Sequence, residues 1–314
     1  MALTQFIWTE KYRPSTIDDC ILPSDTKNTI KSFIAQGDLP NMILSSTNPG
    51  IGKTTLALAM CKELNATTMF INGSEESGID VLRTKIKNFA AALSLDGKRK
   101  YVIIDEADFL NPNSTQPALR GLIEEFAINC GFILTCNYNN RIIPALQSRC
   151  TNINLEASPE EQKLLKLKTL DRIQYILREE NITADEKLII GAIKRFWPDI
   201  RETINEIQLA CSDGVLTPRV LGKHNDVQYD SLWNAIKTRN YKDARAWIGQ
   251  NANIDAASLY RAVFDWLHEN ADETTLPTLI VLTADYQYKH LSAIDPHVHL
   301  AAYVLEIMHN ARYK

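Results

Sequence analysis

The sequence has little that points to a membrane, a metal centre or a disulfide scaffold. No apolar run approaches the roughly 18 residues needed to span a bilayer. The first residues already carry charged side chains, so we expect no secretory signal and no membrane partner. The six cysteines show neither a C-x-x-C pair nor zinc-ligand spacing. We therefore expect reduced, buried thiols in a cytoplasmic protein.

Histidine and net positive charge are also scarce. All six histidines lie beyond residue 223, and the net charge is −4, which excludes bulk electrostatic adhesion to nucleic acid. Residues 78–100 nevertheless hold six Lys and Arg against two Asp, a local net charge of +4. Residues 225–314 hold eight Lys and Arg against eleven Asp and Glu. A nucleic-acid partner is therefore expected to meet the first half of the chain.

The most informative stretch is a glycine-rich turn that follows the apolar run 42–44. A strand, such a turn and a helix predict a phosphate-binding loop, in which backbone N–H groups wrap a polyphosphate. Thr47 stands where the first glycine of such a loop is usual, and an ordinary strand-to-helix turn is the alternative. We expect Lys53 to reach the phosphates of ATP and Thr54 to hold Mg²⁺. The expected ATP-binding residues of the loop are Gly50, Ile51, Gly52, Lys53, Thr54 and Thr55.

A second apolar strand, residues 100–104, ends in two carboxylates. Ligands of α/β proteins lie at the carboxyl ends of such strands. Asp105 is expected to position Mg²⁺, and Glu106 to act as the general base that activates the attacking water. An acidic helix start is the alternative, but together with the lysine loop the pair indicates an ATPase and not merely a nucleotide binder.

The order of strands and helices predicts an α/β fold followed by helices. Residues 1–157 are expected to form a three-layer domain around a parallel sheet. Ser158, Pro159 and Glu161 predict a helix start with a capping box, and 158–222 a small helical domain. Residues 223–314 are expected to be all-helical, with apolar stripes that indicate either a core or an oligomerisation surface. The expected strands are 42–45, 67–71, 100–105, 131–136 and 151–155, and the expected helices are 26–35, 53–64, 79–93, 113–128, 159–180, 184–196 and 199–211.

With these residues in place, the chain resembles the clamp-loader ATPases of the AAA+ class, and among them the large ATPase subunits of T4-type bacteriophage clamp loaders. The resemblance covers nearly the whole chain and is specific mainly in residues 8–210. It implies an AAA+ sheet domain with a P-loop, a helical lid domain and a helical collar domain. Its motifs are 8–14 (WTEKYRP), the phosphate loop, 78–83 (GIDVLR), 105–108 (DEAD), 136–138 (CNY), 147–150 (QSRC) and 198–201 (PDIR).

The resemblance adds residues to the ATP site. Asn137, which leaves the strand 131–136, would orient the attacking water or the γ-phosphate, although Asn is also a common turn former. The adenine would lie between the sheet domain and the lid. For Tyr12 and Ile21, two of the residues that would frame the adenine, plain core packing is the alternative. Those framing residues are Thr9, Glu10, Lys11, Tyr12 and Ile21.

Two arginines would complete the catalytic machinery. By resemblance, Arg201 lies on the lid and contacts phosphate of its own subunit's ATP. Arg149 would serve a neighbouring subunit's site as an arginine finger, a contribution of roughly 10³–10⁵ in rate. A surface salt bridge is the alternative for either residue.

A DNA-binding helix is expected after residue 78. Arg83 and Lys87 are four residues apart and so share one helix face, which in this family follows the DNA backbone. Ser77 and Gly78 would present N–H groups to phosphate at the helix start. A solvated basic face is the alternative. Binding would be selective for DNA structure and not for sequence.

The resemblance predicts an ATP-hydrolysing subunit that opens a sliding clamp and loads it onto primer–template DNA. It implies four copies of this chain and one non-ATPase companion in a pentamer, in the host cytoplasm if the gene belongs to a phage. A DEAD-box helicase would need a second RecA-like domain, whereas everything after residue 157 is expected to be helical. An initiator, helicase-loader or branch-migration ATPase is the main alternative, and the acidic region 225–314 argues against its winged helix. An ATP-locked scaffold conflicts with the complete set of catalytic residues.

Overall fold

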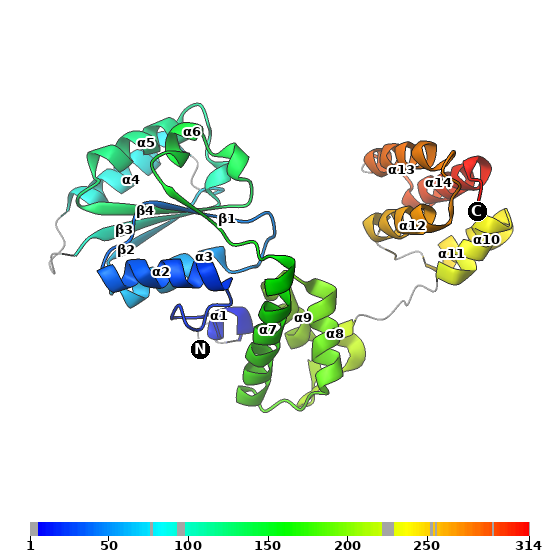
Figure 1. Cartoon of the computed structure of the whole chain (residues 1–314), viewed down its shortest axis with the longest axis horizontal. Helices are drawn as coiled ribbons and strands as arrows, with labels where there is room; N and C mark the ends of the chain where they lie inside the picture. Colours follow the sequence, from blue (N-terminus) through cyan, green and yellow to red (C-terminus); the bar gives the residue numbers. More distant parts are fainter. Residues whose placement is uncertain are drawn as a thin grey trace. The chain divides into compact units, whose positions relative to one another are not determined.

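The computed structural model describes residues 6–75, 78–92, 98–221, 229–251, 254, 256–290 and 292–313. The chain forms two compact units, residues 1–223 and 224–314 (Figure 1). Each is described by itself below. Among the described residues, no helix combines the length and the apolar character that a bilayer crossing requires.

A five-stranded parallel sheet forms the centre of the first unit (Figure 1). Its central strands are almost entirely buried, as in parallel sheets that are covered on both faces. Because all five strands run the same way, their carboxyl ends meet at one edge. The strands lie in the order β2-β3-β4-β1-β5, with bounds β1 Met42–Ser45, β2 Thr68–Asn72, β3 Lys100–Asp105, β4 Cys130–Cys136 and β5 Thr151–Asn154.

Helices cover both faces of the sheet and make it the middle of three layers (Figure 1). On one face Ile30, Leu56 and Met60 are fully buried, and on the other Ile86 and Leu119 are at most 1% exposed. The predicted α/β class is confirmed, and the predicted helix and strand ends lie within three residues of those observed. The covering helices are α2 (Ser24–Gln36) and α3 (Lys53–Glu63) on the first face, and α4 (Ile79–Ala91), α5 (Thr115–Glu125) and α6 (Pro144–Gln147) on the second.

The helical part of this unit includes the beginning of the chain. Trp8 of the short helix α1 (Trp8–Lys11) is 6% exposed in its core, and the backbone N–H of Trp8 donates to Gln208 Oε1 at 3.0 Å. Ser158 caps the first long helix by accepting the N–H of Glu161 at 3.3 Å, as the capping box predicts. The long helices are α7 (Pro159–Glu179), α8 (Glu186–Phe196) and α9 (Ile200–Ala210).

The expectation that residues 158–222 are purely helical is wrong in one place. A small antiparallel hairpin, β6 (Cys211–Ser212) with β7 (Val215–Leu216), precedes the 3-10 helix η4 (Pro218–Leu221). Its turn is Asp213-Gly214, with φ angles of 50° and 76°. An Asp-Gly pair with two positive φ angles is a strong hairpin signal. The sequence therefore contained the signal for this turn.

The second unit contains five helices in its described residues. The two apolar stripes face inward: Leu259, Val263 and Leu267, like Val304 and Ile307, are at most 1% exposed. These side chains therefore form the core of the unit and not an oligomerisation surface. The helices are α10 (Tyr229–Lys237), α11 (Tyr241–Gln250), α12 (Ala256–Asn270), α13 (Leu276–His290) and α14 (Pro296–Asn310).

Four of the six cysteines are buried, and Cys150 and Cys211 are partly exposed. All six thiols are free. Burial raises the pKa of Cys20, Cys61 and Cys136 to about 12. These thiols therefore stay protonated near neutral pH and are poor nucleophiles.

Candidate active site

The glycine-rich loop joins β1 to α3 at the carboxyl edge of the sheet. Gly52, with φ at 99°, immediately precedes α3, and its left-handed conformation turns the chain into the helix. Lys53 Nζ lies inside the loop and donates to the carbonyl oxygens of Ser46 at 3.2 Å and Asn48 at 3.0 Å. Burial lowers the pKa of Lys53. The loop thus surrounds a buried amine at the start of a helix, which suits a polyphosphate.

Gly50 is required for two separate reasons. Its φ is 62°, and a Cβ at this position would lie 1.8 Å from Asp199 Oδ1. Asp199 caps α9 by accepting the N–H of Glu202 at 2.7 Å, and the N–H of Arg201 donates to the Gly50 carbonyl at 3.3 Å. The helical part therefore touches the phosphate loop directly.

Asp105 and Thr54 meet at this edge, as the sequence predicts for a magnesium site. Asp105 Oδ1 accepts hydrogen bonds from the hydroxyls of Thr54 at 2.6 Å and Thr135 at 2.5 Å. Carboxylate and hydroxyl oxygens are the ligands that Mg²⁺ prefers, so these residues fit the ion. Thr135 also accepts the N–H of Glu106 at 3.1 Å. The sequence analysis missed Thr135, although it is a polar residue in an otherwise apolar strand.

Glu106 lies in a cleft with the phosphate-loop residues. Its φ and ψ are 55° and 44°, the left-handed region that non-glycine residues rarely adopt. Such backbone strain clusters at functional sites. The cleft is lined by Pro49, Gly50, Gly52, Lys53, Thr54, Asp105, Glu106, Thr135, Cys136, Asn137 and Arg201.

Asn137 follows β4 and lines the same cleft. Its side-chain Oδ1 is buried and has no hydrogen-bond partner among the described residues. A buried polar atom without a partner costs free energy, so its retention suggests that a ligand or water completes the site. The expectation that Asn137 orients the attacking water or the γ-phosphate stays a prediction.

A second cleft adjoins the phosphate loop on the side of the helical part, and most of the residues expected to frame the adenine line it. Arg172, which the sequence analysis missed, also lines it and donates to the Tyr12 carbonyl at 2.6 Å. Tyr12 both lines the cleft and packs on the helical core, so pocket wall and core packing are not exclusive roles. The expected residues found here are Thr9, Glu10, Tyr12, Ile21, Gly50, Ile51, Gly52, Thr55 and Arg201.

Lys11 does not take its expected place in this cleft. Its Nζ pairs with Glu180 Oε1 at 2.7 Å, at the end of α7, and the Tyr12 hydroxyl donates to the same oxygen at 2.6 Å. These hydrogen bonds lower the pKa of Glu180. Lys11 thus attaches the beginning of the chain to the helical part and is not among the described residues that line the cleft.

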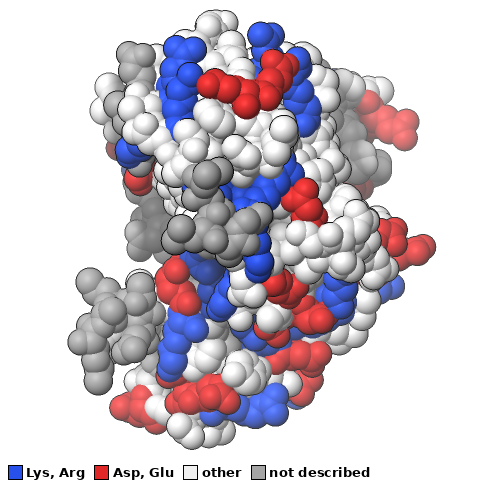
Figure 2. Space-filling model, turned by 90° about the vertical axis from the view of Figure 1, so that its left-hand side faces the viewer, with Lys and Arg blue, Asp and Glu red and all other residues white. Residues whose placement is uncertain are grey.

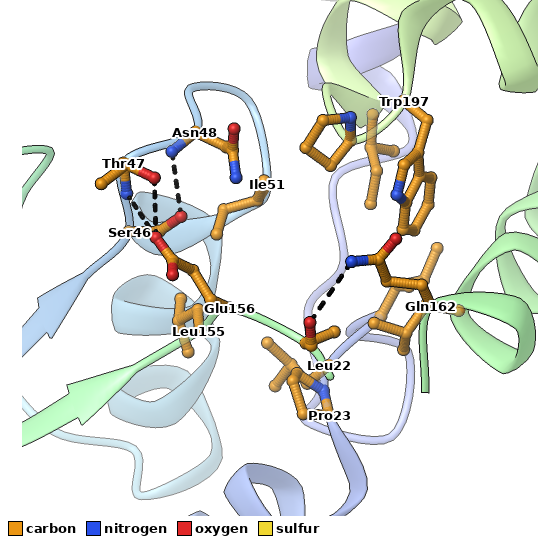
Figure 3. Close-up of a pocket in the computed structure, with 15 residues that line it drawn as sticks. Leu22, Pro23, Ser46, Thr47, Asn48, Ile51, Leu155, Glu156, Gln162 and Trp197 are labelled. Atoms are coloured by element: carbon orange, nitrogen blue, oxygen red, sulfur yellow. Dashed lines mark hydrogen bonds between the residues drawn. The ribbon is translucent and has the colours of Figure 1, made fainter. Parts of the chain in front are cut away.

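A cavity of about 290 Å³ lies beside the first half of the loop, and Figure 3 draws the residues that line it. Glu156, just after β5, accepts from both the N–H and the hydroxyl of Thr47, at 3.1 and 2.7 Å. These bonds lower the pKa of Glu156. A glycine at position 47 has no hydroxyl for this contact. Thr47 therefore links the phosphate loop to the segment that leads into the helical part.

The two arginines take different places. Arg201 lines both clefts. Arg149 lies between α6 and β5, and its guanidinium pairs with Glu124 of α5, with Nε at 2.6 Å from the carboxylate. Arg149 is not among the described residues that line either cleft. The surface ion pair named as the alternative is therefore present, and the role in another subunit's site stays a prediction.

The expected DNA-binding helix is α4. Ser77 lies outside the described residues, and Gly78 precedes the helix in an extended conformation. Arg83 is exposed, whereas Lys87 pairs with Glu125 of α5 at 3.3 Å. Both alternatives, a phosphate-binding face and a solvated basic face, are compatible with this arrangement.

Comparison with known proteins places the chain. Residues 43–156 match the family described as "ATPase family associated with various cellular activities (AAA)". The sliding-clamp-loader large subunit of Enterobacteria phage T4 is 34% identical, over 99% of this chain and 98% of the phage protein. The chain belongs to the family of sliding-clamp-loader large subunits. It is an ATPase subunit of this class.

One further sequence and one solved structure are similar to the chain to different extents. The sliding-clamp-loader large subunit of Escherichia phage RB69 is 38% identical, over 83% of this chain and 80% of that protein. The structure of a RuvB mutant from Thermotoga maritima aligns with a TM-score of 0.55 at 16% identity, covering 81% of this chain and 79% of that one. At this identity the likeness to RuvB shows the fold alone.

Proposed function

We propose that the carboxyl edge of the sheet binds ATP with Mg²⁺, and that hydrolysis there drives the loading of a sliding clamp onto primer–template DNA. The observation that carries the proposal is the convergence of four chain segments on one cleft. The phosphate loop, the end of β3, the end of β4 and the start of α9 all line it. No single motif predicts that convergence.

The proposed chemistry assigns a task to each side chain. Lys53 would bind the phosphates, and Thr54 and Asp105 would hold Mg²⁺, which would supply positive charge against the phosphate oxygens. Glu106 accepts the proton of the attacking water, and Asn137 orients that water or the γ-phosphate. Arg201, which reaches the cleft from α9, contacts phosphate of the same ATP.

Assembly follows from the position of Arg149. We infer that it completes the site of a neighbouring copy, so that ATP stabilises the contact between subunits. Four copies and a non-ATPase companion would form a pentamer in the cytoplasm, with residues 1–157, 158–222 and 223–314 as sheet, lid and collar domains. ATP favours this assembly only through contacts that the dissociated chains lack. Hydrolysis would remove that preference and release the closed clamp.

The proposed DNA contact is local. On the face drawn in Figure 2, Lys and Arg lie among Asp and Glu and do not form one continuous basic surface. We propose that α4 follows the phosphate backbone through Arg83 and Lys87, with N–H groups of Ser77 and Gly78 at its start. Lys87 would exchange its ion pair with Glu125 for a DNA phosphate.

Changing Arg83 and Lys87 together to alanine is expected to weaken primer–template binding equally across DNA sequences. Because each lost phosphate contact removes counterion release, the slope of log affinity against log salt should flatten by about 2. Fluorescence anisotropy over a salt series measures the slope. The matched control changes Arg261 and Lys289, two exposed cations of the second unit, to alanine. An unchanged slope in the α4 variant would show that this helix faces solvent.

The function itself is tested by leaving out one partner at a time. ATPase rate is measured with primer–template DNA and clamp together, then with each omitted. A clamp loader should need both for full stimulation, because the competent assembly of subunits forms around both. Full stimulation by DNA alone, with no response to the clamp, would instead favour an initiator, helicase-loader or branch-migration ATPase.

A further inference from the structure

Asp108 is a buried carboxylate to which the proposed chemistry gives no task. It is 5% exposed and lies in the 3-10 turn η2 (Ala107–Phe109), directly after Glu106. A carboxylate at such depth costs free energy unless its oxygens are hydrogen-bonded. Only one of its two oxygens, Oδ2, has hydrogen-bond partners among the described residues, and these partners indicate what Asp108 does.

Those partners belong to the turn that carries Asn137. Asp108 Oδ2 accepts the N–H of Asn137 at 3.3 Å and the N–H of Tyr138 at 3.1 Å. They are the first two N–H groups after β4 (Cys130–Cys136). One acceptor thus fixes two successive peptide groups, and with them the direction in which the Asn137 side chain leaves the strand.

The hydrogen bonds to Asp108 hold the backbone of Asn137 and leave its side chain free to act in the site. Asn137 Oδ1 is buried without a hydrogen-bond partner among the described residues, and Asn137 lines the phosphate cleft. Its backbone is held by Asp108, while its carboxamide oxygen remains open to a ligand or water.

We propose that Asp108 is a positioning residue for ATP hydrolysis, which holds the backbone of Asn137 so that its carboxamide meets the attacking water or the γ-phosphate. This rests on the proposed role of Asn137 in the same site. Loss of the hydrogen-bond partner that orients a metal ligand typically costs roughly 10–100-fold in activity, and we expect a loss of the same order here. ATP affinity should change little, because the phosphate loop makes the binding contacts.

A competing explanation is the charge of Asp108. Its carboxylate raises the pKa of Lys53, opposing the larger effect of burial, so it also helps to keep that amine protonated. Two substitutions separate charge from position. Asp108→Asn keeps an acceptor oxygen in place and removes the charge, whereas Asp108→Glu keeps the charge and moves the oxygens by one methylene.

The experiment compares steady-state ATPase with clamp and primer–template DNA for these variants and for Asp108→Ala. Positioning predicts that Asp108→Asn stays within about threefold of the parent protein, while Asp108→Glu and Asp108→Ala lose roughly 10–100-fold in kcat. The dissociation constant of a fluorescent ATP analogue should stay within about threefold in all three. Should the alanine variant fail to fold in a thermal unfolding scan, the Asn and Glu variants still decide. Loss of activity in Asp108→Asn with retention in Asp108→Glu would overturn the proposal in favour of charge.

A double-mutant cycle with Asn137→Ala tests whether Asp108 acts through Asn137. If it does, Asp108→Ala should slow Asn137→Ala little further, since the residue that it positions is already gone. If the double variant instead loses the product of the two single fold-losses in ATPase rate, the positioning role is overturned and the proposed function stands. Normal hydrolysis by Asn137→Ala alone would instead remove Asn137 from the proposed site, and this inference with it.

Discussion

Glu106→Gln is expected to bind ATP normally and to lose steady-state turnover. The substitution keeps the size of the side chain and its hydrogen bonding but removes the base that accepts the proton of the attacking water. The left-handed backbone at this position is equally strained with Gln, so the fold should be unchanged. Equilibrium binding of a fluorescent ATP analogue and steady-state release of phosphate measure the two properties.

The matched control is Glu160→Gln, on the exposed first turn of α7. It loses the same charge at a residue that does not line the cleft, and it should hydrolyse ATP at the normal rate. Near-normal turnover by Glu106→Gln itself would remove Glu106 from the catalytic assignment. Loss of ATP binding in that variant would point to a binding role and not to catalysis.

Arg149→Ala is expected to show the behaviour of a residue that acts on a neighbouring subunit. Each chain keeps its own Lys53, Thr54, Asp105 and Glu106, so ATP should bind nearly normally. Hydrolysis stimulated by clamp and DNA should fall by about 10³-fold or more if the residue is an arginine finger. The ion pair with Glu124 does not oppose such a role, because pairs this exposed are worth about 0–1 kcal/mol.

Mixing two inactive variants tests the direction of the contact. Arg149→Ala subunits retain Glu106, and Glu106→Gln subunits retain Arg149. An interface in which the first holds ATP and the second donates its arginine is therefore complete. Partial recovery of ATPase in the mixture would place Arg149 across the interface. No recovery, despite confirmed mixed assembly, would contradict the action of Arg149 at a single neighbouring site.

The sequence predicted the sheet and the phosphate loop well because both depend on local patterns. Continuous apolar runs mark strands that are buried on both faces, and a glycine-rich turn before a helix marks the loop. The contacts that Thr135 and Asp108 make in the site could not be predicted in this way. Ile104 pairs with Leu134 across β3 and β4, and this register brings Thr135 to the Asp105 carboxylate. The sequence of one strand alone does not predict its pairing register with another strand.

The remaining differences have similar causes. The resemblance predicted Lys11 in the adenine pocket together with Thr9, Glu10 and Tyr12, but a helical turn sends adjacent side chains in different directions, and Lys11 meets Glu180 instead. Thr47, which stands in place of glycine, bonds through its hydroxyl to Glu156, 109 positions away. A short sequence motif cannot predict a contact over this separation. Conversely, the Asp213-Gly214 hairpin was readable from the sequence and was missed.

The burial of Trp8 in the helical core has a consequence for how a nucleotide would be sensed. Thr9, Glu10 and Tyr12 follow directly, so this wall of the second cleft is anchored to the helices, whereas the residues that line the phosphate cleft lie at the carboxyl edge of the sheet, except Arg201 of α9. The base of one nucleotide would then contact the helical part, while its phosphates contact the sheet. A bound ATP would bridge these two parts and set the distance between them. Loss of the γ-phosphate would shorten this bridge.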